Sequence, residues 1–238
     1  GTLARTNYLF IGWNTMADGS GTAFATNTSL AMSGNLTLYA QWGSTITYNA
    51  NGATTGTVPA NTYATGTASI NLAPNSGTLA KTGTNFAGWN TAANGSGTSY
   101  IAGSTYTPSG NATLYALWLS NCVSTRTVVG GFAIEKFTNA GTCYWLVPPT
   151  ATSIDYLVVG GGGGGGSSLG GGGGGGQVIL SETVTASGGA IIKIGAGGAG
   201  GVGGYTATTN HGKTGGSSAF LANNRRDIAL GGSGGNGR

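Results

Sequence analysis

Two uninterrupted runs of seven glycines, residues 160–166 and 170–176, constrain this chain more than any other feature. Glycine loses more backbone freedom on folding than any other residue, so ordering these fourteen costs roughly 7–14 kcal/mol. That is about the whole net stability of a typical domain. The runs therefore either stay disordered as a linker or form a packing of bare backbone that no residue with a side chain could enter.

Apolar segments around the runs favour the ordered alternative. Three short segments are rich in Val, Ile and Leu: residues 153–159, 177–184 and 190–194. As unpaired strands they would expose edges that promote aggregation. We expect extended helices with three residues per turn, packed side by side through backbone hydrogen bonds. A small β framework of about five strands would carry them, including residues 126–137 and 142–147 as two strands around a turn.

The first half of the chain is an internal repeat. Residues 1–42 align with residues 77–118 without a gap and share 23 identical positions. One complete repeat therefore covers residues 43–118, and residues 1–42 form a partial repeat whose N-terminal part is missing. We expect the chain to begin inside a longer protein.

Alternating apolar and polar residues within each repeat predict β-strands. The segments 36–42, 45–48 and 112–118 have this period of two. Asp18-Gly19 and the equivalent Asn94-Gly95 predict turns with positive φ. Because no capped stretch has helical periodicity, the expected fold class is mostly β.

The repeat motifs resemble a known family. They are Asn-Ala-Asn-Gly at 49–52, Phe-x-Gly-Trp-Asn-Thr at 86–91, Asn-Gly-Ser-Gly-Thr at 94–98 and Leu-Tyr-Ala-x-Trp at 114–118. This order is similar to the internalin-type B repeat of bacterial surface and secreted proteins. The resemblance implies β-grasp-like tandem repeats that serve as a stalk or interaction module. The extra Thr, Ala and Ser residues after Gly52 depart from the family pattern, so the surface loops are expected to differ.

Residues 122–238 form the second predicted domain, which is glycine-rich and is expected to be truncated. Its motifs are Trp-Leu-Val-Pro at 145–148, Thr-Ser-Ile-Asp-Tyr-Leu-Val-Val-Gly at 152–160, Ile-Gly-Ala-Gly-Gly at 194–198 and Gly-Gly-Ser-Ser-Ala-Phe at 215–220. They resemble glycine-rich domains of bacterial secreted proteins, phage tail-fibre adhesins and the anaplastic lymphoma kinase receptor family. The resemblance implies a small antiparallel β framework that supports polyglycine helices, with ligand-binding loops at the tip of the bundle. The candidate ligand-binding residues are Ser167, Ser168, Leu169, Tyr205, Asn210, His211 and Lys213.

The two cysteines, Cys122 and Cys143, leave two readings open. A chain with a single histidine lacks the ligand spacing of a zinc site. A disulfide would close the loop between them and contribute roughly 3 kcal/mol, and it would imply an oxidising, extracellular setting. Two free buried thiols are the alternative.

Charge and motif content exclude several function classes. Only 6% of the residues are charged, and the net charge of +4 is scattered, so no nucleic-acid partner is expected. The chain contains no run of eighteen apolar residues, so we expect no direct membrane insertion. The glycine run contains G-x-G-x-x-G, but no helix can follow it, which removes the dinucleotide interpretation. The five carboxylates and His211 form no catalytic or metal-binding pattern, so we expect no enzyme activity and no cofactor.

Together these features predict a non-catalytic stalk with an adhesion or display module, located outside the cell or at its surface. The expected partner is an extracellular protein or glycan receptor. Exposed tyrosines such as Tyr39 and Tyr115 could stack on sugars or pair across strands. Two alternatives stay open: an accessory region of a larger secreted enzyme, and the receptor-binding tip of a phage tail fibre.

Overall fold

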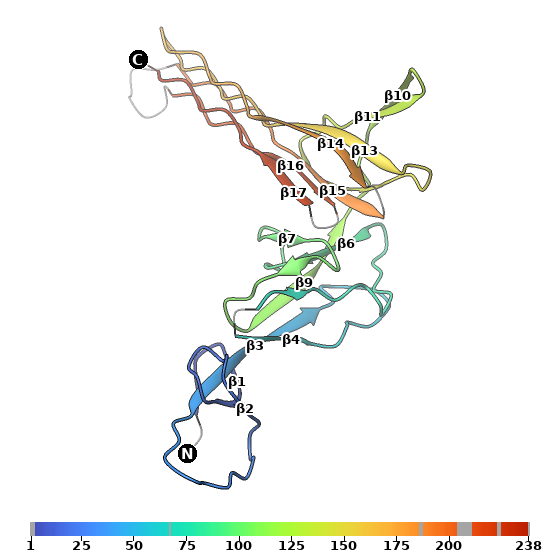
Figure 1. Ribbon diagram of the computed structural model, residues 1–238. Helices are drawn as coiled ribbons and strands as arrows, with labels where there is room; N and C mark the ends of the chain where they lie inside the picture. The colour runs from blue at the N-terminus through green and yellow to red at the C-terminus, as the bar shows by residue number, and fades with distance from the viewer. Residues whose placement is uncertain (1–2, 67, 186–187, 204–210, 223–224, 238) are drawn as a thin grey trace. The chain divides into compact units, whose positions relative to one another are not determined.

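The computed structural model describes residues 3–66, 68–185, 188–203, 211–222 and 225–237. All regular secondary structure in this part of the chain is β-strand, which confirms the predicted mostly β fold class. The chain forms two compact units (Figure 1), the first made of residues 1–82 and 88–117, the second of residues 83–87 and 118–238. Each unit is described by itself below.

A seven-stranded sheet contains most strands of the two repeats. It has the order β2-β1-β3-β9-β6-β7, and β4 also pairs with β3; β5 and β8 form a separate antiparallel pair. The strands are β1 (Leu9–Asn14), β2 (Ala23–Phe24), β3 (Tyr39–Asn49), β4 (Thr62–Thr65), β5 (Ile70–Asn71), β6 (Asn85–Asn90), β7 (Ser99–Tyr100), β8 (Thr105–Tyr106) and β9 (Ala112–Leu119).

Strand β3 joins the partial repeat to the complete one without a linker. Its first half pairs with β1, where Trp13 lies opposite Ala40, and its second half pairs in parallel with β9, where Ile46 lies opposite Ala112. The prediction of two separate strands at 36–42 and 45–48 is therefore wrong. The intervening Gly43 is part of β3, where it pairs with Leu9 of β1 and Thr65 of β4. A larger residue would not fit there, because its β-carbon would lie 2.6 Å from the carbonyl oxygen of Ala64.

The core of the complete repeat is built around Trp89. Its ring is fully buried, packs 4.6 Å from the ring of Tyr48 and donates an indole hydrogen bond of 2.8 Å to the carbonyl of Ala73. In the partial repeat the equivalent Trp13 is half-buried and makes an edge contact with Phe10 at 5.4 Å. Residues 1–42 align with 77–118 and so include no counterpart of Tyr48 or Ala73, the two residues that cover Trp89.

The equivalent turns of the two repeats have the predicted geometry. Gly19 has a φ of 81° and Gly95 a φ of 76°. The side chain before each glycine, Asp18 or Asn94, accepts a hydrogen bond from the backbone N–H two residues later, at 3.0 and 3.1 Å. The repeats thus share this turn structure at equivalent positions, although one has Asp where the other has Asn.

The second unit has a β framework of several small antiparallel sheets. One sheet has the order β12-β15-β16-β17, and β13–β14 and β10–β11 are two-stranded. The strands are β10 (Thr125–Val129), β11 (Phe132–Lys136), β12 (Gly141–Leu146), β13 (Ser153–Val159), β14 (Val178–Thr185), β15 (Gly189–Ile194), β16 (Ser218–Ala222) and β17 (Arg225–Ala229). Buried apolar residues from β13, β15, β16 and β17 form its core: Val158, Ala190, Ile192, Phe220, Ala222 and Ala229.

The predicted strand over residues 126–137 is instead a hairpin of its own. Gly130 and Gly131 have φ angles of 58° and 84°, and Val129 pairs with Phe132 across them. Two successive residues with positive φ make the tight turn that suits a β-hairpin, and glycine adopts it without strain. The Gly-Gly pair therefore reverses the chain rather than continuing the strand.

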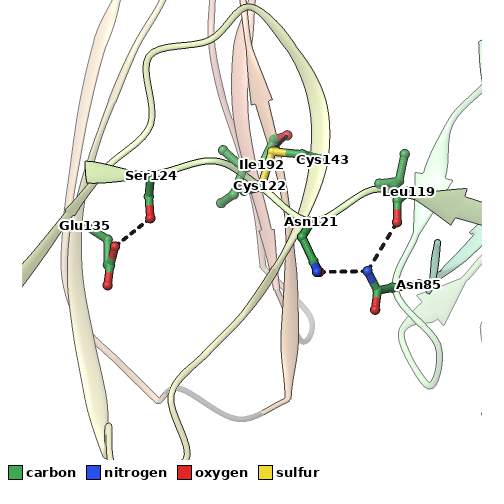
Figure 2. The surroundings of a disulfide bond; sticks show 8 residues. All are labelled: Asn85, Leu119, Asn121, Cys122, Ser124, Glu135, Cys143 and Ile192. Atoms are coloured by element: carbon green, nitrogen blue, oxygen red, sulfur yellow. Dashed lines mark hydrogen bonds between the residues drawn. A yellow bond between two sulfur atoms is a disulfide. The ribbon is translucent and has the colours of Figure 1, made fainter. Parts of the chain in front are cut away.

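Cys122 and Cys143 form a disulfide, which confirms the first of the two interpretations of the sequence and excludes two free thiols. Cys143 lies in β12 opposite Ile192, and the Cα atoms of the two cysteines are 4.9 Å apart. Figure 2 shows the bond together with Asn85, whose side-chain amide donates to the Asn121 side-chain oxygen at 2.8 Å. The bond closes the loop that contains the β10–β11 hairpin.

Candidate functional site

Five glycine-rich segments extend side by side beyond the strands of the second unit (Figure 1). We number them in chain order: the first is 160–166, the second 170–177, the third 195–203, the fourth 211–217 and the fifth 230–237. They lie outside the β-strands, and backbone hydrogen bonds of 2.7–2.9 Å connect them. The five segments together are called the glycine bundle below.

Hydrogen bonds in the first segment follow a period of three residues. The N–H groups of Gly160, Gly163 and Gly166 donate to the second segment, at 2.8–2.9 Å. Those of Gly161 and Gly164 donate to the fourth segment, both at 2.9 Å. A β-strand would alternate its bonds with a period of two, whereas three residues per turn is the period of an extended polyproline II-type helix.

The first segment lies among the other four. Besides donating to the second and fourth segments, it accepts at Gly162 from Gly198 of the third segment and at Gly161 from Gly232 of the fifth, both at 2.8 Å. Four neighbours at hydrogen-bonding distance leave little room around this backbone. Among the described residues, it has hydrogen-bond partners in more segments than any other segment of the bundle.

Glycine is required at two of every three positions of this segment. A β-carbon at Gly160 or Gly163 would lie 2.0 or 1.9 Å from a carbonyl oxygen of the fifth segment. A β-carbon at Gly161 or Gly164 would lie 2.2 or 2.0 Å from a carbonyl oxygen of the third. The obstacle is backbone, which cannot move aside as a flexible side chain can. The close packing of the bundle thus depends on the missing side chains.

A polar cluster in the framework joins its sheets near the start of the bundle. Tyr156 of β13 donates its hydroxyl hydrogen to the carboxylate of Asp227 and stacks on Phe220 at 4.1 Å. Arg225 donates to the same carboxylate at 2.9 Å and to the Ser181 hydroxyl of β14. These contacts connect the β13–β14 pair to β16 and β17.

Two pKa shifts follow from this cluster. The hydrogen bond from Tyr156, with further help from Arg225, lowers the pKa of Asp227. Burial, with the hydrogen bond to Asp227, raises the pKa of Tyr156. The ionised carboxylate and the neutral phenol are therefore the forms that the fold stabilises.

At its other end the bundle forms a tip, defined here by Ser167, Ser168, Leu169, Val202, His211 and Asn236. Ser168 and Leu169, which turn the chain between the first two segments, have φ angles of 49° and 58°. The left-handed region costs a leucine roughly 1–2 kcal/mol. The Leu169 side chain is nonetheless 97% exposed, so it gains nothing from burial in the unit itself.

The structure brings several predicted ligand-binding residues together at this tip. The Ser167 hydroxyl donates to the Val202 carbonyl at 3.4 Å, and the His211 ring nitrogen Nδ1 accepts from the Gly237 N–H at 3.2 Å. Lys213 is exposed in the fourth segment, close to the tip in sequence, with its backbone bonded to the first and third segments. The remaining two candidates, Tyr205 and Asn210, lie outside the described residues.

Sequence reasoning missed two residues of the tip. The Val202 side chain is 71% exposed, and the Asn236 carbonyl accepts from the N–H of Gly171 at 2.7 Å. Val202 could have been found from spacing, because it follows Ala196 and Ala199 at intervals of three. No comparable signal in the sequence indicates Asn236.

Other kinds of site find no support in the described part of the chain. No group of three or more His, Cys, Asp or Glu side chains there is placed to hold a metal ion. Within the same residues, no helix has the length and apolar character needed to span a bilayer. The carboxylate of Glu135 is engaged with Arg126 at 2.9 Å, and that of Asp155 accepts from the Thr183 N–H at 2.6 Å.

Comparison with known proteins agrees with the division of features along the chain. Residues 138–238 match the family model of a glycine-rich domain. Residues 1–41 and 45–117 match the model of the Listeria-Bacteroides repeat domain, a bacterial surface repeat family. These matches do not test whether the repeats are of the internalin type or whether the glycine-rich domain is related to phage tail fibres. No solved structure shows a significant match.

Two curated relatives come from Evansella cellulosilytica. A protein named "Putative Gly-rich membrane protein" is 35% identical over 133 residues, which are 52% of this chain and 15% of the relative. A second, named "Putative membrane protein", is 36% identical over 94 residues, which are 38% of this chain and 14% of the relative. The chain thus spans about one seventh of their length, and it is similar to a bacterial repeat domain and to a glycine-rich domain.

Proposed function

We propose that this chain is a non-catalytic module of a bacterial surface protein. In this proposal the repeats form a stalk, and the tip of the glycine bundle binds an extracellular protein or glycan receptor. The repeat-family match and the relatives named as membrane proteins support placement at the cell surface. The Cys122–Cys143 disulfide adds support, because such bonds persist in oxidising, extracellular settings.

The stalk role is supported by the way the repeats are joined. Strand β3 belongs to both repeats, so no flexible segment separates them. The contact is reinforced where Asn111 donates its N–H to the Asn7 carbonyl at 2.6 Å, and where the Tyr8 hydroxyl donates to the Ser109 carbonyl at 2.7 Å. A shared strand resists bending at the junction better than a linker of Gly and Ser would.

The glycine bundle supplies a stiff support for the tip. We propose that its segments are polyglycine helices with three residues per turn, because their hydrogen bonds recur every third residue. Close packing of the backbone excludes side chains from the inside of the bundle, whereas side chains can project into solvent where the segments end. The bundle would therefore hold a small set of tip residues at the end of a rigid body.

The observation that carries the receptor-binding proposal is the state of Leu169. This residue has a φ of 58° and is 97% exposed. A strained backbone and an exposed apolar side chain both cost stability, and strain of this kind clusters at ligand-binding sites. Val202, also apolar and 71% exposed, lies near it, since the Val202 carbonyl accepts from Ser167.

A binding screen with a tip variant and a matched control tests the proposal. The full chain is applied to a panel of immobilised glycans and extracellular-matrix proteins, beside Leu169→Asn and Leu230→Asn. Leu230, at the opposite end of the fifth segment from the tip, is also an exposed leucine, with 62% of its surface accessible. We expect Leu169→Asn to lose at least about tenfold in affinity for a bound panel member, while Leu230→Asn keeps it. Binding that both variants retain would remove the tip from consideration.

A further inference from the structure

One side of the glycine bundle consists of bare backbone that steric crowding does not explain. It is formed by Gly162 and Gly165 of the first segment and Gly197 and Gly200 of the third, and we call it the bare strip. All four residues are exposed. The two segments run parallel, because Gly198 donates to Gly162 and Gly201 donates to Gly165, each at 2.8 Å.

The third segment contains its own comparison between required and unrequired glycines. At Gly195 and Gly198 a β-carbon would lie 2.1 and 1.9 Å from backbone oxygens of the fourth segment, so glycine is obligatory there. The next position of each triplet carries a side chain, in Ala196, Ala199 and Val202. Side chains are therefore compatible with this segment wherever there is space.

The strip positions have such space and are still glycine. A β-carbon at Gly197 or Gly200 would lie 3.8 or 3.6 Å from the nearest carbonyl oxygen, which is ordinary van der Waals contact. At Gly162 and Gly165 the nearest atom would be 3.8 Å away. Glycine at these four places adds conformational entropy to the unfolded chain without relieving any clash. Packing within the unit therefore does not require glycine at these four positions, as it does not at Gly172 and Gly175 of the second segment, where a β-carbon would meet nothing within 4 Å.

The strip also carries unpaired hydrogen-bonding groups of both kinds. In the first segment two of the three sets of N–H groups bond to neighbouring segments, whereas Gly162 and Gly165, the third set, donate to none of the described residues. In the third segment the carbonyls of Gly197 and Gly200 accept from none of the described residues either. Donors and acceptors thus both recur at intervals of three.

We propose that the bare strip is a self-association surface, occupied by the bare strip of a second copy of this chain. Any occupant must approach as closely as the segments approach one another, so the facing side of its backbone must also lack side chains. It must offer carbonyls three residues apart, about 9.3 Å along an extended helix. The bare strip meets both conditions itself.

A two-fold axis then makes the pairing reciprocal. The Gly162 and Gly165 N–H groups of one copy donate to the Gly197 and Gly200 carbonyls of the other, and the reverse bonds form by symmetry. The same kind of backbone N–H···O=C bond joins the two segments within one copy, where the donor is the third segment and the acceptor is the first. The proposed bonds involve none of the six tip residues, so this proposal does not depend on receptor binding at the tip.

Sedimentation equilibrium of the full chain over a wide concentration range tests the proposal. We expect a monomer–dimer equilibrium that Gly162→Ala with Gly200→Ala weakens about tenfold or more. Because the added methyl groups meet open space, the melting temperature of the monomer should not fall. Ala199→Ser, which changes a side chain on the neighbouring position of the same segment, is the control and should dimerise normally.

Amide hydrogen exchange provides a second readout that needs no variant. The Gly162 and Gly165 amides should exchange more slowly as the protein concentration rises, while exposed amides such as Gly172 keep their rates. A chain that stays monomeric at high concentration would overturn the proposal. So would a dimer that the double variant forms as readily as the original chain. Loss of receptor binding by the Leu169→Asn variant bears on the tip alone and leaves this test unaffected.

Discussion

A β-carbon placed on Gly163 would lie 1.9 Å from the carbonyl oxygen of Ser233, in a segment seventy residues further along the chain. This close approach explains why the two longest glycine runs are ordered and do not form a flexible linker. Each close approach between segments replaces side-chain packing by a backbone contact, and the hydrogen bonds between the segments keep it in place. The entropic cost of ordering glycine is then offset by bonds and contacts that only glycine permits.

Substitution of Gly163 tests this directly. Gly163→Ala forces backbone against backbone, so we expect the second unit to lose at least about 1–3 kcal/mol of unfolding free energy, the usual range for overpacking. Gly172→Ala, in the second run, meets nothing within 4 Å and should be nearly neutral. Denaturant unfolding measures both, and equal losses would contradict the steric explanation.

The disulfide should contribute to the same unit. It closes a loop of 21 residues in sequence separation, for which the chain-entropy estimate is about 3 kcal/mol. The double variant Cys122→Ser with Cys143→Ser should lose about that amount in denaturant unfolding. Mass spectrometry of the secreted, unreduced protein should show the two cysteines joined, and two free thiols would count against an extracellular setting.

The two equivalent tryptophans should differ in their contribution to stability. Trp89→Ala removes a fully buried ring that donates a hydrogen bond to Ala73, so the first unit should lose about 3–5 kcal/mol. Trp13→Ala removes a half-buried ring and should cost about 1–2 kcal/mol. Guanidinium unfolding of the two variants compares them, and similar losses would show that the partial repeat has a complete core after all.

The Tyr156–Asp227 pair predicts how the stability of the second unit depends on pH. The pKa of Asp227 is lowered by folding, so its stabilisation is present above the unfolded value of 3.8 and is lost as pH falls through the folded value. The pKa of Tyr156 is raised, so its contribution is present below 10.0 and is lost as pH rises through the folded value.

Unfolding free energies measured across the acidic range check the first of these limbs. Asp227→Asn should be less stable than the original chain near neutral pH and should lose less stability on acidification. If the two proteins show the same acid dependence, another group controls this limb. Asp18 also has a lowered pKa, but it lies in the first unit and is unchanged in both proteins.

Relief of strain at the tip should separate stability from binding. Leu169→Asn places a residue that tolerates the left-handed region where leucine does not, so the second unit should gain about 0.5–1 kcal/mol. Leu230→Asn has no such strain to relieve and should change little. Thermal unfolding distinguishes them. A destabilised Leu169→Asn variant would mean that the leucine supports the fold and is not held in place for a ligand.

Much of the fold could be predicted because its signals are local. Alternating residues indicated β9, a run rich in Val, Ile and Leu indicated β13, and Asp18-Gly19 indicated a turn. The continuity of β3 could not be predicted, since Gly43 resembles a break until Ala64 is known to lie against it. The site was predicted only in part for the same reason: Ser167 and His211 attract attention in the sequence, but their positions at one end of the bundle depend on long-range contacts.

Backbone hydrogen bonds between glycine segments hold the second unit's bundle in an ordered arrangement. Amide exchange across residues 160–176 tests this most directly. At low protein concentration, the amides of Gly160, Gly161, Gly163 and Gly164 should exchange slowly, because each donates to a neighbouring segment. Those of Gly162 and Gly165 should exchange fast, which gives a pattern with a period of three. Uniformly fast exchange throughout these residues, as in an unstructured peptide, would contradict the account.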